Sequence, residues 1–314
     1  MGAHNPLSAR LVEEAGFDAV WASGFEIAAT RAQPDANILS MTECLEVAAE
    51  LAAAVDVPVL ADCDSGFGGV GNVTHMVCSY EERGVAGVCI EDKLFPKLNS
   101  FVNGHQELAP VGDFAAKIVA ATEARSDPDF VVVARIEALI AGAGMDEALR
   151  RAAVYERAGA DALVIHSKRD VPDEVYEFAE RYTGSLPVIV IPTTYPAVTT
   201  GDLRRRGIDA VIYANQSLRA AIRAMRDVME RIAVSGSTAP VEAEIAPLRD
   251  VFGLQRMDEL LSRQRRYEER AAEFESLASA PAGVESEDEE RELEPALRRG
   301  IARQQRTQAE RSSV

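Results

Sequence analysis

Ala15-Gly16-Phe17-Asp18-Ala19-Val20 is the first of four segments that share one pattern. The others are Arg83-Gly84-Val85-Ala86-Gly87-Val88, Ala158-Gly159-Ala160-Asp161-Ala162-Leu163 and Arg206-Gly207-Ile208-Asp209-Ala210-Val211. In each segment a helical stretch ends at a glycine, which supplies the left-handed cap that stops a helix. The apolar run that follows is too continuous for a half-exposed strand and predicts a strand buried on both faces. Repeated helix–glycine–strand units predict parallel strands joined by helices.

Extended along the chain, the pattern predicts seven strands, at residues 18–23, 57–62, 87–91, 130–135, 162–166, 188–192 and 210–214. Amphipathic helical segments such as 41–54 and 145–158 lie between them. The stub before His4 is the only candidate for an eighth strand. An open doubly wound sheet is the competing fold, but polar residues recur at the carboxyl ends of the strands, where the loops of a barrel meet on one face. We therefore expect an α/β fold, a (β/α)8 TIM-type barrel at residues 1–235.

The pattern changes after Ser235. Residues 236–275 predict C-terminal helices with apolar positions such as Leu254, Leu260 and Leu261. From residue 276 to residue 314 the chain is rich in Ala, Ser, Glu and Arg and includes an acidic run at 285–290. This composition predicts a charged tail that is disordered or weakly helical.

The charge balance restricts the partners. The chain has 314 residues, with 33 Lys and Arg against 51 Asp and Glu, a formal net charge of −18. Such a chain repels nucleic acid and anionic membranes, so we expect neither as a partner and a small-molecule substrate instead. The four cysteines show no metal-binding spacing, and no signal peptide or membrane-spanning run is found, so we expect reduced thiols and a cytoplasmic location.

Carboxylates follow two neighbouring predicted strands. Asp62 and Asp64 end one strand and Glu91 ends the next. Side chains two residues apart on an extended strand point to the same side, and adjacent strand ends lie close together in a barrel. The three carboxylates therefore predict a Mg²⁺ site held partly through water. The alternative is that Asp64 belongs to an ordinary loop and Asp62 caps a helix.

Arg135 and His166 end two further strands. An arginine after an apolar strand favours a carboxylate or phosphate ligand, but a structural ion pair with Glu137 or Glu91 explains it equally well. A lone buried histidine is usually a core residue, whereas the position of His166 at a strand end favours the site.

Residues 91–100, EDKLFPKLNS, resemble the signature loop EDKxFPKxNS of phosphoenolpyruvate mutases. Further matches lie at residues 3–9, 21–24, 62–68, 129–135, 159–167, 214–220 and 245–255. The resemblance covers roughly residues 1–270, and on it the chain is identified as a member of the phosphoenolpyruvate mutase/isocitrate lyase superfamily.

The resemblance implies a Mg²⁺-dependent isomerase that interconverts phosphoenolpyruvate and phosphonopyruvate, a step of phosphonate biosynthesis. It implies that Asp62, Asp64 and Glu91 hold Mg²⁺ and that Trp21, Ser23 and Gly24 contact the substrate. It also implies that Arg135 binds substrate oxygens, with His166 close by. Asp35 matches an active-site aspartate, viewed as a nucleophile or an electrostatic guide. Lys97, Asn99 and Ser100 match a loop that closes over the phosphoryl group.

Other activities within the superfamily remain open. Phosphonopyruvate hydrolase is the nearest, and Asn99 favours the mutase because its match is typically replaced in the hydrolase. Oxaloacetate decarboxylase and carboxy-phosphoenolpyruvate mutase are further alternatives. A lyase is disfavoured, because the loop lacks the cysteine of a KKCGH-type motif. From another class, a catalytically silent barrel acting as a binding protein is possible.

Three features depart from the family pattern: the first strand is apparently truncated, residues 31–40 are looser than the RDSxEAS-type run, and the tail has no counterpart. Loss of strand pairing predicts lower stability. The resemblance also implies a homo-oligomer, a dimer or tetramer, in which the C-terminal helices are exchanged between subunits.

Overall fold

The computed structural model describes residues 1–102, 104 and 106–279. The chain divides into two compact units, the first comprising residues 1–255 and the second beginning at Arg256. The predicted tail at 276–314 lies outside the described residues beyond Ser279, where the last described helix ends. Within the described part, no helix is long and apolar enough to cross a membrane.

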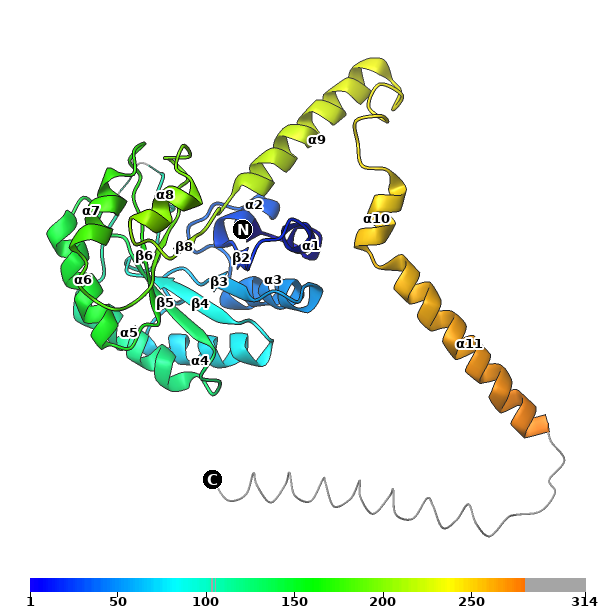
Figure 1. The fold of residues 1–314 in the computed structure, drawn as a ribbon, viewed down its shortest axis with the longest axis horizontal. Coiled ribbons are helices and arrows are strands. Elements are labelled where there is room, and N and C mark those ends of the chain that lie inside the picture. The colour runs from blue at the N-terminus through cyan, green and yellow to red at the C-terminus, as the bar shows by residue number, and fades with distance from the viewer. Residues whose placement is uncertain (103, 105, 280–314) are drawn as a thin grey trace, which may run out of the picture. The chain divides into compact units, whose positions relative to one another are not determined.

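The first unit contains eight parallel strands in chain order (Figure 1). They are β1 (Gly2–Ala3), β2 (Val20–Ala22), β3 (Val59–Asp62), β4 (Gly87–Glu91), β5 (Val131–Ile136), β6 (Ala162–Ile165), β7 (Val188–Val190) and β8 (Ala210–Val211). The Gly2 amide donates to the Tyr213 carbonyl at 2.8 Å, which joins β1 to the segment after β8. The predicted (β/α)8 fold is confirmed, and the stub before His4 is its first strand. A doubly wound sheet would reverse its strand order, and this one does not.

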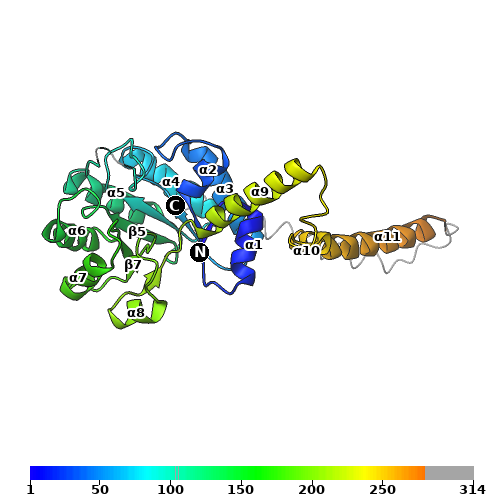
Figure 2. The same ribbon diagram turned by 90° about the horizontal axis from the view of Figure 1, so that it is seen from above.

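Helices that alternate with the strands surround them, as the turned view also shows (Figure 2), and further helices follow β8. They are α1 (Pro6–Glu14), α2 (Gly24–Thr30), α3 (Met41–Ala54), α4 (Val70–Glu82), α5 (Val111–Ala124), α6 (Met145–Arg157), α7 (Asp173–Arg181), α8 (Thr200–Arg205), α9 (Gln216–Ser235) and α10 (Leu248–Leu254). The glycines of the four repeated segments, Gly16, Gly84, Gly159 and Gly207, all have positive φ, between 78° and 95°. These left-handed caps end the helices where the sequence pattern placed their ends.

Strand alternation divides the apolar side chains into two layers. On β5, Val132 and Ala134 belong to the core between strands and helices, whereas Val133 belongs to a smaller inner cluster with Trp21 and Val164. Because side chains alternate along a strand, residues two positions after an inner one also face inward. The polar residues at the strand ends, which follow inner residues by two positions, therefore point into the barrel.

The second unit begins with α11 (Met257–Ser279), a single helix of 23 residues. It buries no residue and exposes large apolar side chains, among them Leu260, Tyr267, Phe274 and Leu277. The exchange of C-terminal helices between subunits stays a prediction.

Candidate active site

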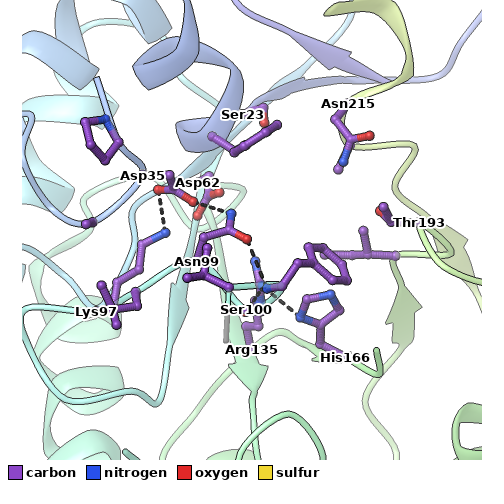
Figure 3. Close-up of a pocket in the computed structure, with 18 of the residues that line it drawn as sticks. Ser23, Asp35, Asp62, Lys97, Asn99, Ser100, Arg135, His166, Thr193 and Asn215 are labelled. Atoms are coloured by element: carbon purple, nitrogen blue, oxygen red, sulfur yellow. Dashed lines mark hydrogen bonds and ion pairs between the residues drawn. The ribbon is translucent and has the colours of Figure 1, made fainter. Parts of the chain in front are cut away.

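A cavity of about 480 Å³ opens at the carboxyl ends of the strands (Figure 3). It is lined by Trp21, Ser23, Phe25, Pro34, Asp35, Ala36, Asp62, Lys97, Leu98, Asn99, Ser100, Phe101, Val102, Arg135, His166, Ile191, Thr193, Ala214 and Asn215. These include every predicted site residue except Gly24, Asp64 and Glu91. Those three lie directly behind the lining: a Cβ added to Gly24 would lie 3.3 Å from Asp62, Asp64 pairs with Lys97, and Glu91 pairs with Arg135.

The strand register explains this convergence. Trp21, Cys89, Val133 and Val164 lie in the inner layer, and Ser23, Glu91, Arg135 and His166 follow them by two residues. The carboxyl ends of β2, β4, β5 and β6 therefore aim polar side chains into one cavity. Glu91 and Arg135 are also register partners on β4 and β5.

Two of the three predicted metal ligands, Asp62 and Asp64, have raised pKa values. Burial, and then the negative charge of Asp64, raise the pKa of Asp62 to about 7. Burial also raises the pKa of Asp64. The Glu91 Oε1 atom is buried and has no hydrogen-bond partner among the residues described. A bound cation would stabilise the ionised form of these buried carboxylates.

These carboxylates do not form a complete metal site by themselves. Across residues 1–102, 104 and 106–279, no three Asp, Glu, His or Cys side chains are grouped closely enough to hold a metal ion. The Lys97 ammonium lies among them, 2.9 Å from Asp64 Oδ1. Mg²⁺ at this place would therefore keep several water ligands, as it usually does in proteins.

Asp35 is the centre of contacts made by the 97–99 segment. Lys97 Nζ lies 2.7 Å from Asp35 Oδ1, and Asn99 Nδ2 donates to Asp35 Oδ2 at 2.6 Å (Figure 3). Although burial raises the pKa of Asp35, the Lys97 charge and both hydrogen bonds bring it below its ordinary value. Burial acts to lower the pKa of Lys97, but the carboxylates of Asp64, Glu91 and Asp35 raise it well above its usual range. Asp35 is therefore ionised, and Lys97 is a cation at the cavity wall.

Arg135, Glu137 and His166 form a second cluster. Glu137 Oε1 accepts from Arg135 Nε at 2.5 Å and lies 2.8 Å from His166 Nδ1. Burial disfavours a charge on His166 and lowers its pKa, so the ring is neutral. His166 Nδ1 also lies 2.8 Å from Arg135 Nη2, which can only donate. Nδ1 therefore donates to Glu137 in one tautomer, which leaves Nε2 as an acceptor, and accepts from Arg135 in the other. The Nε2 atom is buried without a hydrogen-bond partner in the described part of the chain.

Several residues of the site were not predicted as functional. Glu137 was considered only as an ion-pair partner of Arg135, yet it also contacts His166 and Ser100. Asn37 accepts from the Lys97 amide at 2.5 Å and donates to Asp64 at 2.6 Å, from a left-handed backbone (φ 56°). Thr193 and Asn215 line the cavity across from Lys97. The position of Asn215 directly after the last strand could have identified it as a site residue from the sequence.

Comparison with known proteins fits this geometry. The family model for phosphoenolpyruvate phosphomutase matches residues 1–233. Phosphonopyruvate hydrolase from Variovorax sp. (strain Pal2) is 45% identical over 269 residues, covering 85% of this chain and 93% of that protein. Phosphoenolpyruvate phosphomutase from Streptomyces hygroscopicus is 47% identical over 255 residues, covering 81% of this chain and 82% of that protein.

Two solved structures share the fold. Phosphoenolpyruvate phosphomutase from Streptomyces platensis subsp. rosaceus superposes with a TM-score of 0.84 at 53% identity, covering 85% of this chain and 93% of that one. Phosphonopyruvate hydrolase in complex with oxalate and Mg²⁺ gives a TM-score of 0.81 at 45% identity, with the same coverages. The barrel and its site define a chain of the phosphoenolpyruvate mutase/isocitrate lyase class. The chain belongs to the phosphoenolpyruvate phosphomutase family, whose close members include both mutases and a hydrolase.

Proposed function

We propose that this protein is a phosphoenolpyruvate mutase, an isomerase that interconverts phosphoenolpyruvate and phosphonopyruvate. The observation that carries the proposal is the convergence of Lys97 and Asn99 on Asp35 at the cavity wall. An ammonium and an amide N–H group held side by side suit the oxygens of a migrating phosphoryl group. Phosphoryl transfer has a charge-dispersed transition state, so fixed donors accelerate it mainly by positioning and electrostatics.

Mg²⁺ is the cofactor that the residues fit. Asp62, Asp64 and Glu91 offer only oxygen donors, and the buried Glu91 Oε1 atom, which has no hydrogen bond among the described residues and lies 3.8 Å from Lys93 Nζ, would gain a ligand contact. Bound there, the ion would stabilise the negative charge of the pyruvate enolate. Since Lys97 contacts Asp64, the lysine and the ion would share this carboxylate.

The remaining residues orient the substrate. The Arg135 guanidinium faces the cavity and suits the substrate's carboxylate or enol oxygens, while Ser23 and the Gly24 amide at the start of α2 supply neutral donors. Asp35 fixes Lys97 and Asn99 by hydrogen bonds, which fits the role of an electrostatic guide. In the reaction the bond between phosphorus and C3 breaks and a bond between phosphorus and the enol oxygen forms, so the atoms balance without water.

The hydrolase is the second candidate, and one observation favours it. His166 lines the cavity and its Nε2 atom has no partner among the described atoms, so in the tautomer with the proton on Nδ1 it could take a proton from an attacking water. In that reaction water takes the phosphoryl group, and the enolate gains a proton to give pyruvate.

Turnover of phosphonopyruvate by the purified protein with Mg²⁺ separates the candidates. ³¹P NMR shows a mutase by the appearance of phosphoenolpyruvate, and a hydrolase by stoichiometric inorganic phosphate with pyruvate. No turnover with phosphonopyruvate, and none with oxaloacetate, would overturn the enzymatic proposal and leave the silent barrel.

A further inference from the structure

Ser100 lies in the loop segment but bonds entirely to the barrel. Its side chain is buried, with 4% of its surface exposed. Its Oγ atom lies 2.7 Å from Lys93 Nζ, 2.7 Å from Glu137 Oε2 and 3.3 Å from Arg135 Nη2. Of these three partners, only the carboxylate can accept a hydrogen bond.

These three contacts use the full hydrogen-bonding capacity of the Ser100 hydroxyl group. A serine hydroxyl has one proton to donate and two lone pairs that accept. The proton goes to Glu137, and the lone pairs receive Lys93 and Arg135. No capacity remains for a substrate oxygen, although Ser100 borders the cavity.

Glu137 joins the loop to the substrate-binding groups. One of its oxygens accepts from Ser100, and the other contacts Arg135 and His166. Its amide donates to Asp92 Oδ1 at 2.8 Å, and Asp92 is itself held by Arg151 and Tyr155. The backbone of Glu137 is therefore anchored to Asp92, and its carboxylate ties the loop, through Ser100, to Arg135 and His166.

We infer that Ser100 is a positioning residue, and that Lys93 and Glu137 form a latch that holds the 97–100 segment against the barrel. This inference deepens the proposed function and rests on it for its catalytic consequence. A latched loop keeps Lys97 and Asn99 on Asp35 and keeps water away from the phosphoryl group. The family resemblance also allows Ser100 to be a substrate-binding residue, and the latch is the alternative to that role.

Hydrogen–deuterium exchange tests the latch without requiring turnover. In the closed segment the Lys97 amide donates to Asn37 and the Asn99 amide donates to the Asp35 carbonyl, so both amides report closure. With Mg²⁺ and oxalate as the probe, Ser100→Ala should speed exchange of the peptide covering residues 97–101 by about tenfold to a hundredfold, the effect of losing one hydrogen bond to a charged group. Ser79→Ala, which removes a hydroxyl bonded only within α4, is the matched control and should change nothing.

Lys93→Met removes the ammonium, which also donates to the Leu98 carbonyl at 3.0 Å and so holds the loop at a second point, and keeps an unbranched apolar stem. Lys93→Met should therefore be the faster of the two single variants. If Ser100 and Lys93 act as one latch, the double variant should exchange at nearly the rate of the faster single variant. Loop exchange that is unchanged in Ser100→Ala, or effects that multiply fully in the double variant, would overturn the latch.

Kinetics give the second readout. Ser100→Ala should lower kcat on phosphonopyruvate, change KM less than twofold and raise the share of inorganic phosphate among the products. A raised KM with kcat unchanged would instead identify Ser100 as a substrate ligand. If the wild-type protein turns over no phosphonopyruvate, the proposed function fails, while the exchange experiment still decides whether the latch exists.

Discussion

Asn99 is the residue whose chemistry most separates the mutase from the hydrolase. Its amide donates to Asp35 at 2.6 Å beside Lys97, so its removal takes one fixed donor from the phosphoryl site and opens space for water. We expect Asn99→Ala to lower mutase turnover by about 100-fold, as loss of one transition-state donor does. The share of phosphate in ³¹P NMR should rise. Asn72→Ala at the start of α4 is the control, and mutase activity that persists in Asn99→Ala would contradict this role.

Asp62 should make Mg²⁺ binding depend on pH. Burial and Asp64 raise its pKa to about 7. Below that pH a proton occupies the carboxylate that the ion needs, and above it the carboxylate is free, so stabilisation by Mg²⁺ should grow as pH rises from 6 to 8. Thermal unfolding with and without Mg²⁺ measures this difference. Asp62→Asn should weaken this pH dependence but not remove it, because the pKa of Asp64 is raised as well, and a wild-type difference that is flat across this range would count against the metal site.

At the scale of elements, buried Asp92 connects β4 to α6 and to the segment after β5. It accepts from Tyr155 Oη at 2.7 Å and from Arg151 at 3.0 Å. Burial raises the pKa of Asp92 to about 6, so it is ionised at pH 8. Tyr155→Phe should then lower the free energy of unfolding by about 1.5–3 kcal/mol, the value of a hydrogen bond to a charged group. Urea denaturation at pH 8 checks this, with exposed Tyr267→Phe on α11 expected to change nothing.

Helices and strands could be predicted from the sequence where a local pattern sets their bounds. The glycine caps and apolar runs predicted β4 at its observed bounds and β5 within one residue, and α3 occurs at the predicted residues 41–54. Position at a strand end favoured a place in the site for His166, and the ligand role of Arg135 stood level with a structural ion pair. The partners of Lys97 were not predictable in this way, because Asn37 and Asp35 reach it across 60 and 62 residues of chain. Likewise, the role of Glu137 depends on three elements meeting at one carboxylate.

At the scale of the whole molecule, we expect α11 to take part in assembly. A helix that buries nothing gains no packing energy, and most helical stability in proteins comes from a packed face. In α11, Leu260, Phe274 and Leu277 are 54%, 59% and 70% exposed. Large apolar side chains exposed along one helix favour an interaction site, and the family resemblance implies a second copy as the partner. We expect light scattering to give the mass of a dimer or tetramer. The double variant Leu260→Glu with Phe274→Glu should lower the measured mass. Arg265→Glu on the same helix is the control and should leave the mass unchanged. A wild-type monomer at micromolar concentration would exclude the exchange of helices and would leave α11 to another partner.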